Sequence, residues 1–233
     1  FQVFDATCPL VTKVHVEVAK LAKEGFEFIM IGHKGHPEVE GTMGQLTEGI
    51  YLVEDTADVA LVHPRGDKLA VVTQTTLSVD DAAEISAAVK ARFPNVREPK
   101  QQDICYATQN RQLAVKQMAA DCDLMLVIGS RNSSNSVRLV EVALEHGTPA
   151  GHLVDYADEI DESWLDGVST VGVTSGASVP EILVRGVLEY LEARGYGDVS
   201  PVVAAQESIM FSLPAEIRRD LKAAGKADTM RHD

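Results

Sequence analysis

The feature that most constrains the fold of this chain is an internal repeat with a period of 97 residues. Cys8 and Cys105 stand 97 positions apart, and so do Gly32 and Gly129, each of which ends an apolar run. The polar stretches that follow the two glycines keep the same spacing. Equal offsets at a cysteine, a strand end and a polar stretch indicate two copies of one structural unit.

Each copy alternates between the apolar spacing of helices and the short apolar runs of strands. The predicted strands share an apolar run closed by polar or turn residues, and they cover residues 26–32, 50–54, 69–74, 124–129 and 169–174. The predicted helices share apolar residues three or four positions apart, and they begin after Cys8, after Ser78, after Cys105, near Val137 and at Pro180. Strands that alternate with helices imply parallel sheets and an α/β fold.

Chain length supports a division into two units. The 233 residues, of which 45% are hydrophobic, suffice for two compact units of about 100 residues each. We predict one α/β unit over residues 1–99, a second over residues 100–197, and a C-terminal extension over residues 198–233. Because parallel α/β sheets bind ligands at the carboxyl ends of their strands, the polar stretches after the strands are the candidate site.

Charge and apolar patterning exclude several classes of partner. The net charge of −14 argues against nucleic acid, whose phosphates require a basic surface. The longest apolar runs, such as residues 124–129, fall far short of the roughly 18–20 residues of a membrane helix. No secretory leader opens the chain, so we expect a cytoplasmic protein. A small anionic ligand is compatible with the charge, because helix N-termini bind phosphate without net positive charge.

The cysteines are too few and too odd in number for a disulfide framework. Pro9 predicts that Cys8 lies at the start of a helix, where the positive helix end favours a thiolate ligand or nucleophile. A lone cysteine is more often an inert core thiol, but the matching Cys105 weakens that interpretation. Cys122 has no counterpart at the 97-residue spacing, and we interpret it as structural.

The stretch IGHKGHPEVEG contains two histidines and two glutamates. The His-x-x-His spacing invites a zinc interpretation, but the glycines and the proline predict a loop and not the helix that presents paired zinc ligands. An ordinary polar surface loop is the alternative. Beside a ligand, His36 and Glu38 would supply a hydrogen-bond donor and a proton source.

Hydroxyl and amide side chains follow further strands. Thr75 and Thr76 stand between a strand and a helix, where hydroxyl groups often serve only as caps. The stretch from Ser133 to Ser136 is richer, since one of its four polar side chains suffices as a cap and the others are free to hold an anion. Ser178 lies in a similar stretch, TSGASVPE. Two such stretches predict a site for a phosphate or diphosphate group.

These features leave three hypotheses open. Two thiolates without a disulfide framework suit an iron–sulfur cluster. They suit zinc as well, because thiolate and imidazole ligands both tolerate that metal. The anion-binding stretches would serve a non-redox diphosphate-binding module or a hydrolase equally well.

Several longer motifs resemble those of one enzyme family. DATCPLVTK, GHKGHPEVEGTMGQ, TQTTLSVDD, DICYATQNRQ, SSNS and GASVPE are similar to motifs of the 4-hydroxy-3-methylbut-2-enyl diphosphate reductases, and the resemblance runs from the first residues to about Glu181. It implies a trefoil of three similar α/β units around a central [4Fe-4S] cluster, with one cysteine from each unit. On this resemblance the N-terminal unit of the trefoil is expected to be absent from the chain.

The resemblance also implies roles for individual residues. Cys8 and Cys105 match the second and third cluster ligands. His36 would contact the substrate, and Glu38 would relay protons to the departing hydroxyl group. The residues that would hold the substrate are Thr75 and Thr76 for that hydroxyl group, and Ser133, Ser134, Asn135 and Ser178 for the diphosphate.

The family reaction is a reductive dehydroxylation, the last step of the methylerythritol phosphate route to isoprenoids. The resemblance implies that two electrons and two protons convert the allylic alcohol diphosphate into isopentenyl and dimethylallyl diphosphate, with ferredoxin or flavodoxin as the electron donor. Because two cysteines would leave the cluster exposed, we expect the chain to be inactive alone. Neither nucleic acid nor a membrane is expected as a partner.

Overall fold

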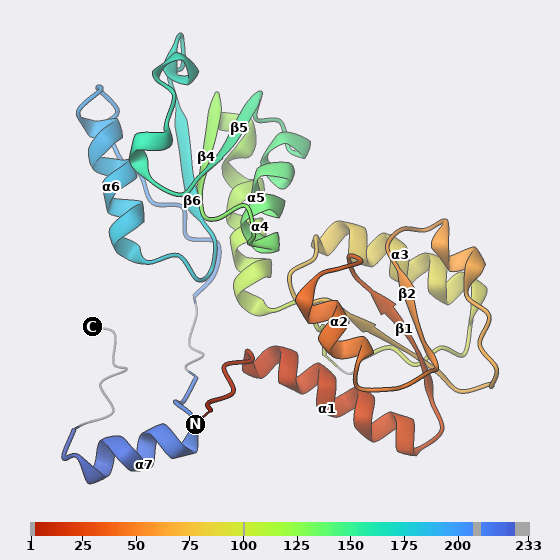
Figure 1. Cartoon of the computed structure of the whole chain (residues 1–233). Coiled ribbons are helices and arrows are strands. Elements are labelled where there is room, and N and C mark those ends of the chain that lie inside the picture. Colours follow the sequence, from red (N-terminus) through yellow and green to blue (C-terminus); the bar gives the residue numbers. More distant parts are fainter. Residues whose placement is uncertain (1–2, 100, 207–210, 227–233) are drawn as a thin grey trace.

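Two three-stranded parallel sheets form the centre of the fold (Figure 1). The structure is a computed structural model and describes residues 3–99, 101–206 and 211–226. The strands of the first sheet are β1 (Glu27–Ile31), β2 (Ile50–Val53) and β3 (Leu69–Thr73), and those of the second are β4 (Leu124–Ile128), β5 (Ala150–Val154) and β6 (Val171–Ser175). Their orders are β2-β1-β3 and β5-β4-β6, so the first strand along the chain is central in each sheet.

The helices follow one another in the same order around each of the two sheets. Their bounds are α1 (Pro9–Lys23), α2 (Pro37–Met43), α3 (Val79–Arg92), α4 (Tyr106–Met118), α5 (Ser134–Glu145), α6 (Glu181–Glu192) and α7 (Ala215–Ala223). Helices α1 and α2 pack on one face of the first sheet and α3 packs on the other. In the same way, α4 and α5 pack on one face of the second sheet and α6 on its other face. The prediction of two similar α/β units is confirmed.

The first helix illustrates how apolar spacing builds these layers. Val14, Val18 and Leu21 recur every three or four residues and are buried. They belong to one core cluster with Phe28 and Met30, alternate residues of β1. Each apolar side chain of this size stabilises the fold by about 1.5–3 kcal/mol when it is fully buried. The buried residues of α1, spaced three or four apart, therefore pack in one core layer with alternate residues of β1.

The predicted loop after β1 is a helix over part of its length. Helix α2 begins at Pro37, and His36 is its N-cap, whose Nδ1 accepts a hydrogen bond from the backbone N–H of Glu38 at 3.2 Å. Proline is favoured at the first helical position, and acidic residues such as Glu38 and Glu40 are favoured in the first turn. The prediction of a loop was therefore wrong, because the proline that argued against a helix is the residue that starts it.

Two further elements have no counterpart among the predicted ones. Strand β5 reads AGHLV and lies at the edge of its sheet, and α7 reads AEIRRDLKA and is mostly polar. Strand β5 lacks a continuous apolar run, and the apolar stripe of the short helix α7 consists of little more than Ile217 and Leu221. The unit boundaries predicted at residues 99 and 197 stay predictions.

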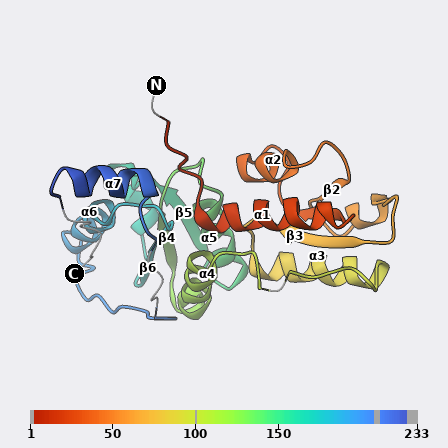
Figure 2. The same cartoon turned by 90° about the horizontal axis from the view of Figure 1, so that it is seen from below.

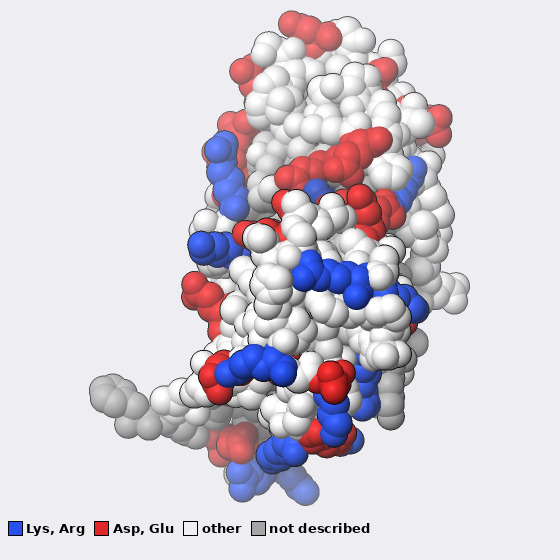
Figure 3. All heavy atoms as spheres, turned by 90° about the vertical axis from the view of Figure 1, so that its right-hand side faces the viewer, with Lys and Arg blue, Asp and Glu red and all other residues white. Residues whose placement is uncertain are grey.

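The surface carries charges of both signs. Figure 3 shows lysine and arginine side chains interspersed with aspartate and glutamate on the face that it presents. In the described part of the chain, none of the helices combines the length and the apolar character needed to cross a bilayer.

The first turn of α3 carries acidic residues that contact basic residues of the second unit. Asp81 pairs with Arg138 of α5, and Asp80 pairs with Lys116 of α4. His146, at the end of α5, lies 4.0 Å from the carboxylate of Asp80. Negative charge is favourable at a helix N-terminus, so the two aspartates stabilise the start of α3 and also pair with basic residues of the second unit.

A buried glutamine adds a neutral contact at the same place. Gln112 of α4 is 1% exposed. Its Oε1 accepts a hydrogen bond from the backbone N–H of Val79 at 3.0 Å, and its Nε2 donates to the carbonyl oxygen of Leu77 at 2.8 Å. Because the first N–H groups of a helix lack partners within the helix, the second unit satisfies part of the start of α3.

Breaking the pair between Asp81 and Arg138 is expected to weaken the contact between the units. The side chain of Arg138 is 15% exposed and that of Asp81 is 50% exposed. We therefore expect a coupling free energy of about 1 kcal/mol in a double-mutant cycle of Asp81→Asn and Arg138→Met, measured by urea unfolding. As a control, the exposed pair of Glu181 and Arg185 within α6 should couple by only about 0.3–0.5 kcal/mol. Equal coupling energies for the two pairs would contradict this expectation.

Candidate functional site

The polar side chains singled out from the sequence gather beyond the carboxyl ends of the strands. The loops after β1, β3, β4 and β6 lead into α2, α3, α5 and α6. Hydrogen bonds join the loop after β1 to the end of β3, and join the end of β3 to the start of α5. Residues of both units therefore form one site.

Glu38 and Thr75 form a close polar pair in this site. Oε1 of Glu38 accepts a hydrogen bond from the backbone N–H of Thr75 at 2.6 Å, and Oε2 accepts one from Oγ1 of Thr75 at 3.0 Å. Burial raises the pKa of Glu38, although the two hydrogen bonds from Thr75 oppose this effect. The carboxyl group is thus fixed in orientation and has a raised affinity for a proton.

His36 stands beside this pair at the start of α2. Its side chain is partly buried, and its Nδ1 is engaged in capping the helix. Burial, and after it the nearby His33, lowers the pKa of His36. The neutral ring is therefore favoured, and with Nδ1 as an acceptor it presents Nε2–H as a donor to a ligand.

Gln74 joins three segments of the site, although its sequence context indicates only the end of a strand. The side chain is fully buried. Its Oε1 accepts a hydrogen bond from the backbone N–H of His33 at 3.0 Å. Its Nε2 donates to Oγ1 of Thr76 at 2.9 Å and to Oγ of Ser134 at 3.3 Å. The last of these bonds crosses from the first unit to the second.

The start of α5 presents the predicted anion-binding side chains. Ser133 is the N-cap of α5. Its Oγ accepts two hydrogen bonds from Ser136, one from the backbone N–H at 3.3 Å and one from the side-chain Oγ at 3.0 Å. Asn135 is 6% exposed, and neither its Oδ1 nor its Nδ2 has a hydrogen-bond partner among the described residues. Buried amide groups without a partner are rare, so Asn135 indicates a place where a ligand completes the hydrogen bonding.

Ser178 lies on the loop after β6, which packs against the start of α5. A Cβ atom on Gly176 would lie 2.2 Å from Oγ of Ser136, and the same distance holds for Gly129. Only glycine permits such a close approach at these two strand ends. Ser178 itself is exposed, and in the part of the chain that is described no hydrogen bond joins it to the other predicted residues.

Arg111 is the second site residue that the sequence pattern does not reveal. Its Nη1 donates hydrogen bonds to the carbonyl oxygen of Ser175 at 2.8 Å and to the Oγ of the same residue at 3.2 Å. Ser175 ends β6 and leads into the loop that holds Ser178. Arg111 therefore links α4, which starts after Cys105, to that loop.

Cys8 and Cys105 occupy the same place in the two units, at the N-caps of α1 and α4. Pro9 is the first residue of α1, which confirms the predicted helix start. Cys8 is exposed, and Cys105 is partly exposed. Sγ of Cys105 accepts a hydrogen bond from the backbone N–H of Thr108 at 3.3 Å. The backbone N–H of Cys105 donates to the carbonyl oxygen of Thr75 at 2.9 Å, so this cysteine is attached to the segment that contacts Glu38.

The starts of the two cysteine-bearing helices lie near each other in both ribbon views (Figure 1 and Figure 2). Lys13 of α1 approaches Asp103, two residues before Cys105, to 3.8 Å. Two thiols on neighbouring helix ends are side chains of the kind that holds an iron–sulfur cluster. Among the residues that the structure describes, however, no group of three or more histidine, cysteine or carboxylate side chains could hold a metal ion.

Taken together, the described side chains offer three kinds of chemistry. Hydroxyl and amide groups at the start of α5 can donate hydrogen bonds to an anion. A carboxyl group with a raised proton affinity can act as an acid. Two thiols at helix N-termini can bind a soft metal centre.

Comparison with known proteins gives consistent matches. The family described as LytB protein matches residues 1–192. The 4-hydroxy-3-methylbut-2-enyl diphosphate reductase of Polaromonas sp. (strain JS666) is 66% identical over 221 residues, which are 94% of this chain and 66% of that protein. The protein of the same name from Streptomyces avermitilis is 61% identical, over 96% of this chain and 66% of that protein. The chain thus spans just under two thirds of the length of these relatives.

Solved structures agree with these matches. The E-1-hydroxy-2-methyl-but-2-enyl-4-diphosphate reductase from Plasmodium falciparum is similar with a TM-score of 0.89 at 37% identity, over 95% of this chain and 70% of that chain. A structure of (E)-4-hydroxy-3-methyl-but-2-enyl diphosphate reductase is similar with a TM-score of 0.52 at 33% identity, over 82% of this chain and 68% of that chain. The arrangement of both units is shared most fully with the first of these two structures.

Proposed function

The chain belongs to the LytB protein family, and on this premise we propose that it contains two of the three cysteine-bearing units of a 4-hydroxy-3-methylbut-2-enyl diphosphate reductase. The reaction would be the reductive dehydroxylation of that substrate to isopentenyl and dimethylallyl diphosphate. One observation carries the proposal most strongly. The amide of Asn135, which has no hydrogen-bond partner among the described residues, shares a site with the partly buried carboxyl group of Glu38. The pair suits a substrate with an anionic end and a hydroxyl group that must leave.

The diphosphate would bind at the start of α5. Ser133, Ser134 and Asn135 offer hydroxyl and amide donors there, and the N-terminus of a twelve-residue helix adds partial positive charge. Ser178 would approach from the adjoining loop after β6. Neutral donors of this kind let a protein with a net charge of −14 bind an anion without a basic cluster.

The hydroxyl group of the substrate would lie next to Glu38 and Thr75. Because burial raises its pKa, Glu38 can hold a proton and deliver it to the departing oxygen. Thr75 and Thr76 would hold that oxygen, since the Oγ1 of Thr75 already donates to the carboxylate that moves the proton. His36 would contact the substrate through Nε2–H.

Cys8 and Cys105 would hold two corners of a [4Fe-4S] cluster, and a further unit of the trefoil would supply the third cysteine. When bound, the cluster supplies electrons and a Lewis-acidic iron for the hydroxyl group. Both cysteines are N-caps, Cys8 of α1 and Cys105 of α4. We infer that ferredoxin or flavodoxin delivers the electrons in the cytoplasm.

The test is anaerobic reconstitution with iron and sulfide, followed by an assay with the allylic diphosphate and a chemical reductant. A fusion of this chain with the remaining third of the Polaromonas reductase should bind iron and turn over the substrate. The chain alone should do neither to a comparable extent. Tight binding of the diphosphate without any iron or turnover in the fusion would instead support a non-redox diphosphate-binding protein.

A further inference from the structure

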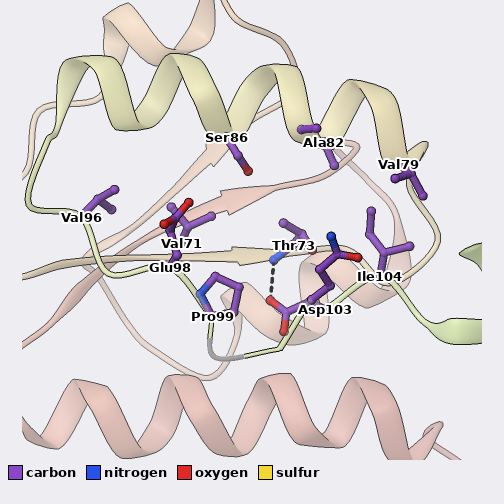
Figure 4. A pocket seen from close by; sticks show the side chains of 12 residues that line it. Val71, Thr73, Val79, Ala82, Ser86, Val96, Glu98, Pro99, Asp103 and Ile104 are labelled. Carbon is purple, nitrogen blue, oxygen red and sulfur yellow. Dashed lines mark hydrogen bonds between the residues drawn. The ribbon is translucent and has the colours of Figure 1, made fainter.

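The segment between the two units runs along the free edge of β3. The backbone N–H of Val71 donates to the carbonyl oxygen of Arg97 at 2.9 Å, and the N–H of Arg97 donates to the carbonyl oxygen of Leu69 at 2.8 Å. At the other end, the N–H of Cys105 bonds to Thr75 at 2.9 Å. Between these contacts a cavity of about 370 Å³ separates the segment from β3 and α3 (Figure 4). Among the residues of the segment that the structure describes, backbone pairing with the first unit is therefore confined to the two ends.

Asp103 supplies a side-chain contact between these two ends. Its side chain is fully buried, and its Oδ2 accepts a hydrogen bond from the backbone N–H of Thr73 at 3.1 Å, which Figure 4 marks with a dashed line. Its Oδ1 has no hydrogen-bond partner among the described residues and lies 3.8 Å from Nζ of Lys13. One carboxylate thus contacts both β3 and α1.

The residues in these contacts lie close in sequence to the two cysteines or to Thr75. Thr73 is two residues before Thr75, and Asp103 is two residues before Cys105. Lys13 lies on α1, little more than one turn after Cys8, which is the N-cap of that helix. Asp103 is therefore placed between the starts of the two cysteine-bearing helices.

We propose that Asp103 is a positioning residue that fixes Cys8 and Cys105 relative to each other and to Thr75. The inference rests on the proposed function, which gives the two cysteines a common ligand. Without this carboxylate, the backbone N–H of Thr73 loses its acceptor and Lys13 loses its counter-charge. The part of the segment that borders the cavity can then shift, and the start of α4 shifts with it.

The test measures how fast a short bifunctional maleimide bridges Cys8 and Cys105 in the metal-free chain. A Cys122→Ala background removes the third thiol. Asp103→Ala should lower the rate of intramolecular bridging about tenfold, because the lost restraint lowers the effective concentration of one thiol at the other. Far-UV circular dichroism checks that each variant is folded.

Two substitutions separate the contacts that Asp103 makes. Asp103→Asn keeps an acceptor for the N–H of Thr73 but removes the charge that faces Lys13. The rate of bridging between Cys8 and Cys105 should therefore fall by the same factor in Asp103→Asn as in Lys13→Met. The double variant should lose no more than either single variant, because both remove one interaction. Asp123→Ala is the matched control. The carboxylate of Asp123 accepts hydrogen bonds from the backbone N–H groups of Ser169 and Thr170 at 2.9 and 3.0 Å. It lies just before β4 and contacts neither cysteine-bearing helix through these bonds, so bridging should be unchanged.

The outcomes distinguish this inference from the proposed function. Bridging at the unaltered rate in folded Asp103→Ala and Asp103→Asn proteins would overturn the role of Asp103. If Asp103→Ala does not fold, unequal losses in Asp103→Asn and Lys13→Met would overturn it instead. Bridging needs no cluster, so a whole protein that binds no iron would count against the proposed function and leave this inference standing.

Discussion

Replacing Cys8 and Cys105 together by serine is expected to remove the iron of the reconstituted whole protein and to lower its turnover by at least about a thousand-fold. Such a loss corresponds to about 4 kcal/mol of transition-state stabilisation. The reason is the position of the two thiols at the N-caps of α1 and α4, where under the proposed function they would hold two corners of one cluster. Serine hydroxyl groups keep the size of the side chains but are poor ligands for iron. Iron content and anaerobic turnover measure the effect.

Cys122 provides the matched control for this experiment. It is 7% exposed and packs in a core cluster with Met125 and Val142, in agreement with the structural role expected from the sequence. Cys122→Ala should therefore leave the iron content unchanged and cost about 1–2 kcal/mol of unfolding free energy. Unaltered turnover in the double serine variant would exclude a cluster held by these two cysteines.

Glu38→Gln is expected to lower turnover by about 10²–10⁴-fold with little change in KM, since it removes a positioned acid and keeps the shape of the side chain. The glutamine oxygen can still accept the hydrogen bond from the backbone N–H of Thr75. Steady-state kinetics of the reconstituted whole protein separate the two parameters. Glu40→Gln, on the exposed surface of the same helix, is the control and should leave turnover unchanged. A rise in KM without a fall in kcat would assign Glu38 to binding instead of proton transfer.

The same substitution has a predicted signature in stability. Burial raises the pKa of Glu38 above its ordinary value of 4.5. At a pH below that value, the carboxyl group is protonated in the folded and in the unfolded chain. As the pH rises, the unfolded chain loses this proton first, so the folded state loses stability until the pH passes the folded pKa. Glu38→Gln lacks this titration, and its unfolding free energy relative to the unsubstituted chain should increase between pH 4 and pH 8. A pH-independent difference would contradict the burial effect.

Much of the fold was predictable because its strongest signals are local. The apolar run at residues 124–129 corresponds to β4, which is buried along its whole length. The regular spacing of Val14, Val18 and Leu21 corresponds to α1. Strand β5 was not predictable in this way, because Gly151 and His152 interrupt its apolar run and only its last residue is buried.

The candidate site was indicated in part by the same kind of local signal. Cys8, Glu38 and Asn135 follow from their places before helices and after strands. The contacts of Gln74 could not be predicted, since His33 is 41 residues away from it and Ser134 is 60 residues away. Local sequence marks a polar residue at the end of a strand but does not indicate which distant segments the fold brings to it.

The shared strand order of the two sheets has a consequence for how the halves came to differ. After the central strand of the first sheet stand His36 and Glu38, which can exchange protons, and at the matching places after the central strand of the second stand Ser133 and Asn135, which cannot. The cysteine before the first helix is common to both halves. Because the two units share one fold, each can keep a cysteine at the start of its first helix while the loop after its central strand carries different side chains. One chain can therefore combine acid–base groups from one unit with anion-binding groups from the other.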